Sequence, residues 1–190
     1  MLDTKFFKKI QADYNQTDKE RREVQKVSGD ALHAAKRAIF DLHRGDVKSA
    51  KATLKESLAG LVNADKIYVK KSADDEGIYR AALEEYVEAE LFRQFVEKET
   101  VGEVRGIKVG IETYLGGLTD LVGEILRFAV KQATERHHKE LVYAGETAED
   151  IMSVLVGFNF TGYLRTKNDQ AKSSKRKLEE MLYEVSLRSK

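Results

Sequence analysis

The 190-residue chain contains no proline, no cysteine and no tryptophan. Average usage of about 5% would place roughly ten prolines in a chain of this length. Because proline breaks the interior of a helix, its absence predicts long helices that nothing interrupts. The absence of cysteine excludes disulfides, thiolate metal ligands and cysteine nucleophiles.

Long hydrophobic runs are missing as well. The chain has no stretch of 18 apolar residues, the length needed to cross a membrane. Its N-terminus also lacks the charged and then apolar pattern of a secretory leader. We therefore expect a cytoplasmic protein that does not associate with membranes. With 42% hydrophobic residues the chain can bury a sizeable core, and we assign residues 1–190 to a single domain.

The charges nearly cancel in number but are segregated along the chain. There are 33 basic and 32 acidic residues, a net charge of +1. Residues 72–124 carry 13 acidic and 5 basic side chains, whereas both flanking segments are net basic. This pattern suits an anionic ligand held beside metal-binding carboxylates. Chance segregation on solvated helix faces is the alternative, and charge alone does not decide between them.

The helical spacing of apolar residues predicts an all-α fold. Gly45 should end the first helix, and Thr147 with Asp150 resembles a capping box that would begin the fifth. The expected helices cover residues 3–44, 47–67, 74–99, 112 onward, 147–164 and 169 to the C-terminus, with Asp74, Asp75 and Glu76 opening the third. The apolar arc of the first helix includes Phe6, Ile10, Val24, Ala31, Ala35, Ala38 and Leu42.

Two glutamates of the third helix lie on its apolar side. Glu85 and Glu88, in the string EEYVEAELFRQF, point into the apolar arc rather than away from it. Burying an ionised carboxylate is costly unless a cation or hydrogen-bond donors compensate, so these residues are candidate metal ligands. Salt bridging at an oligomer interface is the alternative. The neighbouring Glu84 and Glu90 are expected to point elsewhere.

A second acidic pair lies in the string GGLTDLVGEILR of the fourth helix. Asp120 and Glu124 are four residues apart and share a face, and three glycines lie on that same face. Each glycine costs the helix about 1 kcal/mol relative to alanine, so close approach of another helix or of a ligand should offset it. The alternative is that Glu124 pairs with Arg127 at the surface and that the glycines serve packing alone.

Two carboxylates on each of two helices can form an all-oxygen site, which suits Mg²⁺ or Mn²⁺. Such ions activate water and stabilise charge in phosphodiester cleavage. A di-iron site would need Glu-x-x-His, which neither helix supplies. The histidines have no metal-ligand spacing and are expected at the surface; they are His33, His43, His137 and His138.

Basic residues form a stripe along the first helix, with Lys19, Arg22, Lys26 and Arg37 within a narrow arc. Over its length an unbroken helix could follow a phosphate backbone. Aromatic residues are not interleaved with the stripe, which favours phosphate contact over base stacking. The ordinary polar face of a helix is the alternative, although such faces usually mix the two signs of charge.

Five strings together resemble the translin superfamily, and its TRAX branch (translin-associated factor X) more than translin itself. They are DKERREVQKVSGD and KRAIFDLHR in the first helix, LEEYVEAELFRQF in the third, ETYLGGLTDLVGEILR in the fourth and KRKLEEMLYEVSLRS in the last. The resemblance covers residues 17–189. It implies an all-α bundle of six to seven helices, assembly into a closed octameric shell, and Mg²⁺-dependent cleavage of single-stranded RNA inside that shell.

The resemblance also implies roles for individual residues. The family's catalytic acids fall on Glu85, Glu88 and Asp120, and Glu124 matches a further acidic position of the same motif. Translin proper lacks the paired glutamates, which is why the TRAX branch is favoured. The basic residues of DKERREVQK match the family's RNA-binding segment. The extended tails of the eukaryotic members are absent, which points to a compact, prokaryotic relative. A homo-oligomer and an assembly with a translin-like partner subunit both remain open.

The sequence therefore predicts a metal-dependent endoribonuclease. All-α nucleoside triphosphate pyrophosphatases also use Glu-Glu-x-x-Glu, which Glu84, Glu85 and Glu88 fit. Their second motif is Glu-x-x-Asp, however, and Asp120 and Glu124 have a different spacing and the reverse order. A non-catalytic RNA-binding shell is the third interpretation, from a different class of function.

Overall fold

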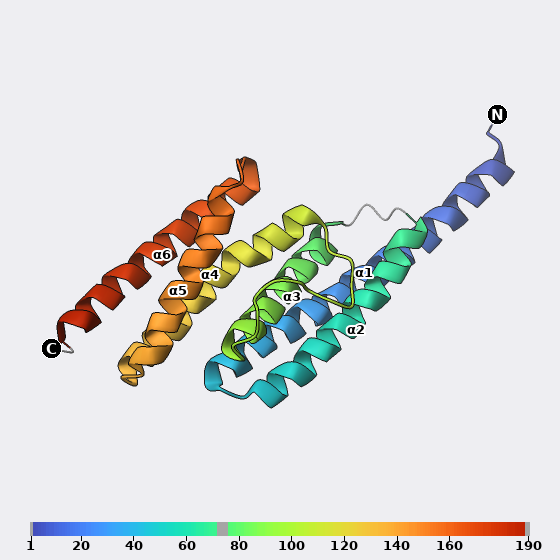
Figure 1. The fold of residues 1–190 in the computed structure, drawn as a ribbon. Helices are drawn as coiled ribbons and strands as arrows, with labels where there is room; N and C mark the ends of the chain where they lie inside the picture. Colours follow the sequence, from blue (N-terminus) through green and yellow to red (C-terminus); the bar gives the residue numbers. More distant parts are fainter. Residues whose placement is uncertain (1, 72–75, 189–190) are drawn as a thin grey trace.

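The structure, a computed structural model, describes residues 2–71 and 76–188, and within these residues all regular structure is α-helical (Figure 1). The helices are α1 (Thr4–Arg44), α2 (Val47–Lys71), α3 (Glu76–Val96), α4 (Ile111–Thr134), α5 (His138–Val156) and α6 (Gly162–Arg188). The all-α prediction is confirmed. No helix in the described part of the chain is long and apolar enough to span a membrane.

The ends of the first helix follow from its sequence. The side chain of Asp3 accepts hydrogen bonds from the backbone N–H groups of Lys5 and Phe6, which have no partner inside the helix. Gly45 ends the helix in the left-handed conformation, at a φ of 81°, as expected for a glycine in this position. The third helix begins at Glu76; Asp74 and Asp75, also expected at its start, lie outside the described residues.

The predicted start of the fifth helix was wrong. This helix begins at His138, and Thr147 lies in its interior, where its hydroxyl donates to the carbonyl oxygen of Tyr143. Gly145, in the interior of the same helix, allows close packing: a Cβ atom there would overlap the side chain of Leu182 on α6. The glycine marks a helix–helix contact, a signal that sequence spacing does not separate from a break.

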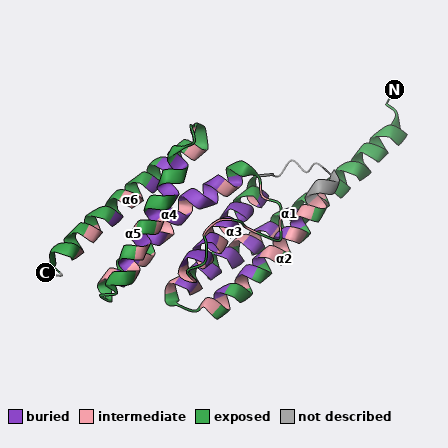
Figure 2. Ribbon diagram, in the orientation of Figure 1, coloured by how far each residue is buried: buried purple, intermediate pink, exposed green. Residues whose placement is uncertain are grey.

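The core lies between two groups of helices that meet at α3 and α4. Helix α1 packs against α2 and α3, α3 packs against α4, and α4 packs against both α5 and α6. Buried residues are concentrated on α3 and α4 (Figure 2). These two helices carry the four predicted acids, so the acids lie at the centre of the fold rather than on its outer helices.

The first helix projects beyond this core. Its first buried residue is Val24, and the N-terminal turns extend past the end of α2 (Figure 1). Phe6 and Ile10 were expected on the buried arc, but they are 54% and 49% exposed. The arc itself is correct, because Ala31, Ala35 and other members of it are buried. In the described part of the chain, no other helix packs against these first turns.

Candidate active site

The glycines of α4 allow it to approach α3 closely. A Cβ atom at Gly116 would lie 2.7 Å from Cδ of Glu84, and one at Gly117 would lie 2.9 Å from the backbone oxygen of Glu84. Both distances are too short for real contacts. At Gly117 alanine would require a shift of the helices, whereas at Gly116 it would require the Glu84 carboxylate to turn away. The predicted close approach is confirmed at these two positions. Gly123 is different, because a Cβ atom there would have nothing within 4 Å.

The close approach brings the two predicted acidic pairs together. We call Glu85, Glu88, Asp120 and Glu124 the carboxylate cluster. Burial raises the pKa of Glu88 well above its usual value, and the negative charges of Asp120, Glu85 and Glu124 raise it further. Burial also raises the pKa of Glu85 and of Asp120. Burial and mutual repulsion therefore disfavour the charged forms of these carboxyl groups.

A buried lysine from α6 completes the cluster, and sequence spacing gave no signal for it. The ammonium group of Lys167 contacts a carboxylate oxygen of Asp120 and lies 3.0 Å from Oε1 of Glu84. Burial lowers the pKa of Lys167, but its hydrogen bonds to Asp120 and Glu84 outweigh burial and hold the pKa above the ordinary value. Lys167 is therefore a permanent cation inside the site.

Glu84 was expected to point away from the site, and this prediction was wrong. Its side chain is buried, faces Gly116 and accepts a hydrogen bond of 2.6 Å from the hydroxyl of Tyr163. Lys167 follows Tyr163 by one helical turn, so both reach Glu84 from the same face of α6. The prediction for Glu84 failed because the face of α3 that contacts α4 is wider than the arc of apolar residues from which that face was predicted. Glu90 does point elsewhere, to Arg93.

A histidine also belongs to the site. The side chain of His43 is only 8% exposed, its Nε2 contacts Glu124, and its ring lies 4.7 Å from the ring of Phe92 between centroids. The surface position expected for this histidine was wrong; His33, His137 and His138 are exposed. Arg127, the alternative partner predicted for Glu124, also lies near it, with its guanidinium nitrogen 3.8 Å from Oε2 of Glu124.

The side chains of the carboxylate cluster are of the chemical type that binds a divalent cation. Carboxylate oxygens are the ligands that Mg²⁺ and Mn²⁺ prefer, and carboxylates that burial and mutual repulsion destabilise call for a cation. Among the described residues, however, no three acidic or histidine side chains already stand in position to hold a metal. Lys167 holds Asp120, and Lys36 lies 3.9 Å from Glu85. Binding would therefore require these side chains to turn toward one another.

The predicted basic stripe lies on the exposed side of α1. Lys19, Arg22, Lys26 and Arg37 are all exposed, and α1 is unbroken beneath them. Two of them form ion pairs, Arg22 with Asp18 at 2.6 Å and Arg37 with Glu56 at 2.8 Å. Lys36, adjacent to Arg37, faces Glu85. Arg37 of the stripe thus faces α2, whereas Lys36 beside it in the sequence faces α3.

Comparisons with known proteins agree with this architecture. The chain aligns with the solved apo-NeC3PO structure at a TM-score of 0.87 and 22% identity, covering 97% of this chain and 98% of that one. It aligns with AfC3PO in complex with duplex RNA at a TM-score of 0.88 and 23% identity, covering 95% and 96%. The chain also aligns with a further AfC3PO structure at a TM-score of 0.88 and 24% identity, covering 95% of this chain and 97% of that one. At these identities the likeness establishes the shared fold.

Sequence comparison identifies the family. Curated protein sequences give no significant match. The model of the Translin family matches residues 19–189, which is nearly the whole chain and includes the carboxylate cluster. On the strength of this match, the chain belongs to the Translin family.

Proposed function

We propose that this protein is a Mg²⁺-dependent endoribonuclease of the TRAX type. The observation that carries the proposal is the carboxylate cluster, in which two acidic pairs from neighbouring helices repel one another at the centre of the fold. Such a cluster costs stability unless a cation offsets it. The solved complex of AfC3PO with duplex RNA, a protein of the same fold, supports RNA as the substrate class.

Glu85, Glu88 and Asp120 would hold Mg²⁺, with Mn²⁺ as a substitute. When bound, such an ion supplies activation of water and stabilisation of charge in phosphodiester cleavage. Glu124 would be a further ligand or would orient the attacking water, and its contact with His43 fixes its direction. Burial of these side chains keeps competing solvent away and strengthens their electrostatic effect.

The basic stripe would hold the RNA strand by its phosphates. Lys19, Arg22, Lys26 and Arg37 are exposed along one helix, so they can contact successive phosphates without reading the bases. Lys36 lies outside the stripe and faces Glu85, so it would offer a cation beside the carboxylate cluster.

The assembly is the second part of the proposal. We propose a closed homo-oligomeric shell, an octamer by resemblance to the family, with the acids facing its interior. The chain carries both the acids and the basic stripe, so it needs no second subunit type for either role. An assembly with a translin-like partner subunit is the alternative, and the mass of the purified particle distinguishes the two.

The test compares RNA cleavage by the wild type with cleavage by the Glu88→Gln variant. Glu179→Gln, a change at an exposed glutamate of α6, is the matched control. Single-stranded and duplex RNA are assayed in Mg²⁺, in Mn²⁺ and in EDTA. We expect metal-dependent cleavage that Glu88→Gln abolishes and Glu179→Gln retains. Equal cleavage by both variants would overturn the assignment of the site.

A non-catalytic RNA-binding shell is the second candidate, favoured by the lack of a preassembled metal site in the described residues. It predicts that RNA is retained without cleavage in either metal. The pyrophosphatase interpretation loses support, because Glu84 of its Glu-Glu-x-x-Glu motif is bonded to Tyr163 and Lys167. Release of pyrophosphate from free nucleotides would revive it.

A further inference from the structure

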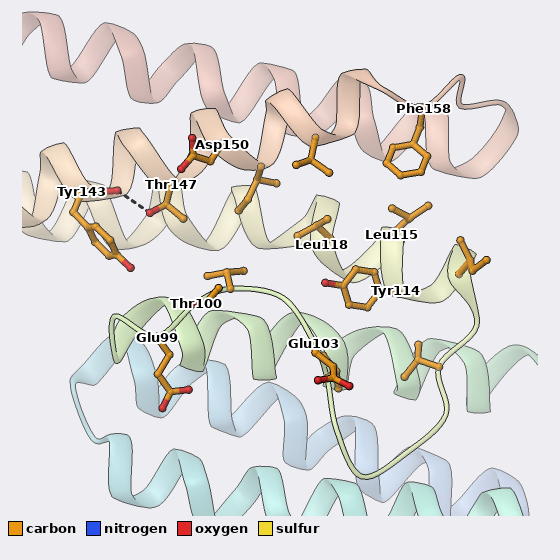
Figure 3. A pocket seen from close by; sticks show the side chains of 16 residues that line it. Glu99, Thr100, Glu103, Tyr114, Leu115, Leu118, Tyr143, Thr147, Asp150 and Phe158 are labelled. Carbon is orange, nitrogen blue, oxygen red and sulfur yellow. Dashed lines mark hydrogen bonds between the residues drawn. The ribbon is translucent and has the colours of Figure 1, made fainter.

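The described part of the chain also forms a cleft that is separate from the carboxylate cluster. It is a cleft of about 770 Å³ between the loop of residues 97–110, α4 and α5, and none of the four acids lines it (Figure 3). Its walls are mainly apolar, with Leu115 and Leu118 on α4 and Phe158 after α5 among them. A cleft of this size and character is typical of a binding site.

The mouth of the cleft leaves apolar surface in contact with solvent. Ile111 and Val154, which line it, are 78% and 57% exposed. Three acidic residues also line it and no lysine or arginine does. Arg93 pairs with Glu99 and Arg105 with Glu103, whereas the described residues supply no ion pair to Asp150. The mouth is thus apolar with an acidic rim, and exposed apolar surface of this kind marks an interaction site.

The same chain exposes a second apolar surface. We call residues 4–16, the projecting start of α1, the N-terminal arm. Phe7, Ile10 and Tyr14 of the arm follow the i, i+3, i+7 spacing by which helices dock into grooves, with Phe6 one turn before Ile10. All four side chains are about half exposed or more. The arm is therefore an apolar helix face without a partner in its own chain.

The charge of the arm is opposite to that of the cleft. The arm contains three lysines and one acidic residue, Asp13, so its net charge is positive. On a helix of 3.6 residues per turn, Lys9 lies nearest an edge of the apolar face, whereas Lys5 and Lys8 lie behind it. Long lysine side chains beside an apolar face can reach a carboxylate at the rim of a groove while their stems remain on apolar surface.

The arm cannot reach the cleft of its own chain. It is the start of one unbroken helix of 41 residues whose other end is fixed in the core. Figure 1 shows the arm at one extremity of the molecule, while α4 and α5, which form the cleft, lie beyond α3. The helix would have to break to bring them together. A second copy of the chain has no such constraint.

We propose that the N-terminal arm of one copy docks in the cleft between α4 and α5 of the next copy. Two different surfaces then meet, and such head-to-tail contacts close into a ring when the rotation permits. Aromatic residues on both sides, Phe6 and Phe7 on the arm and Phe158 in the cleft, would pack together. The proposal rests on the proposed oligomer but not on its nuclease activity.

Engineered cysteines test this contact on a chain that has none of its own. The full-length Ile10→Cys variant is mixed with the full-length Val154→Cys variant, allowed to exchange subunits and oxidised. We expect a disulfide-linked dimer in the mixture and its loss when either variant is oxidised alone. Tyr183→Cys, an exposed position of α6 outside the cleft, replaces Val154→Cys in the matched control and should give no link.

Charge reversal gives an independent measurement. Lys9→Glu should cause loss of the high-mass particle in native mass measurements, and Asp150→Lys in the same chain should restore it. If the wild type is oligomeric but the Ile10→Cys and Val154→Cys variants form no disulfide, the docking proposal is overturned and the proposed shell is not. A monomeric wild type overturns the shell itself. Arm-dependent binding to anionic vesicles without a link would assign the arm to membranes and overturn the proposal.

Discussion

At the scale of single residues, the site is defined by one cation among several buried acids. Lys167 contacts Asp120 and Glu84, and Tyr163 donates to Glu84 from the turn before. These contacts join α6 to α3 and α4 at the point where the candidate ligands lie. The lysine therefore both stabilises the apo protein and holds Asp120 away from a metal.

Replacing Lys167 by methionine should destabilise the protein. The substitution keeps the apolar stem but leaves Glu84 and Asp120 without their cation, and removing one partner of a buried pair costs about 3 kcal/mol. The measurement is the urea midpoint. Lys172→Met, at an exposed lysine whose pair with Asp169 is 3.4 Å long, is the control and should change stability by less than about 0.5 kcal/mol. Equal midpoints for the two variants would contradict this.

The raised pKa of Glu88 predicts how stability depends on pH. Burial and the neighbouring carboxylates raise this pKa in the folded state, so the folded protein binds the proton more tightly than the unfolded chain. The stabilisation is complete below the unfolded pKa of 4.5 and is lost as pH rises toward the folded pKa.

Glu88→Gln should therefore become more stable than the wild type as pH rises from about 4.5 toward 8, by up to about 1.4 kcal/mol for each pH unit between the two pKa values. Urea unfolding across this range measures it. Added Mg²⁺ should stabilise the wild type and not the variant, because only the folded site binds the ion. A constant difference at all pH values would show that Glu88 does not titrate in this range.

At the scale of elements, the spacing between α3 and α4 depends on glycine. Gly117 faces the backbone of Glu84, whereas Gly123 in the same helix faces open space. One helix thus contains a glycine required for packing and another that only weakens the helix.

Alanine substitution should separate these two roles. Gly117→Ala would place a Cβ atom 2.7 Å from Cγ1 of Val87 and should destabilise the protein by about 1–3 kcal/mol. Gly123→Ala should stabilise it by up to about 1 kcal/mol, since alanine is the better helix former. Thermal unfolding of both variants provides the comparison. If Gly117→Ala were as stable as Gly123→Ala, the close approach would be incorrect.

The stripe on α1 makes a separate prediction about RNA. Lys19 and Lys26 are exposed, and neutralising both as glutamine should weaken RNA binding without changing its sequence preference. The slope of log K against log salt should fall by about 1.4 for single-stranded RNA, because each phosphate contact contributes about 0.7. Filter binding at several salt concentrations measures it, with Lys172→Gln on α6 as control. An unchanged slope would remove the two lysines from the interface.

At the scale of the whole molecule, the proposals concern the assembly. The acids lie where α3 meets α4, the basic stripe runs along α1, and the arm projects past the end of α2. A chain with one projecting apolar helix and one apolar cleft is expected to associate with other copies of itself, because both apolar surfaces are exposed to solvent in the monomer.

The native particle should have a mass of eight times the 21.5-kDa chain if the family's octamer applies. With RNA and Mg²⁺ added, the particle should retain shortened RNA, whereas EDTA should leave the RNA at full length. Native mass spectrometry followed by gel analysis of the bound RNA measures both quantities. A monomer, or full-length RNA in Mg²⁺, would contradict the shell or its activity respectively.

The sequence predicted most of the elements and half of the site. The absence of proline and the apolar spacing gave the all-α fold and the end of α1 at Gly45. Glu85 and Glu88 were selected because carboxylates on the apolar side of a helix are costly, and Asp120 and Glu124 because they share a helix face with three glycines. Glu84, Lys167 and His43 were missed, because each reaches the site across a contact between helices distant in sequence.

The sequence by itself determined the helices, the identity of the four acids and the basic stripe, because each follows from residue type and local spacing. Only the tertiary structure decided that the acids share one cluster, that Lys167 and His43 join it, and that the arm lacks a partner. The physical reason is that burial and charge compensation depend on which helix faces which. A single helix records its own apolar arc but not the side chains that its neighbours bring to it.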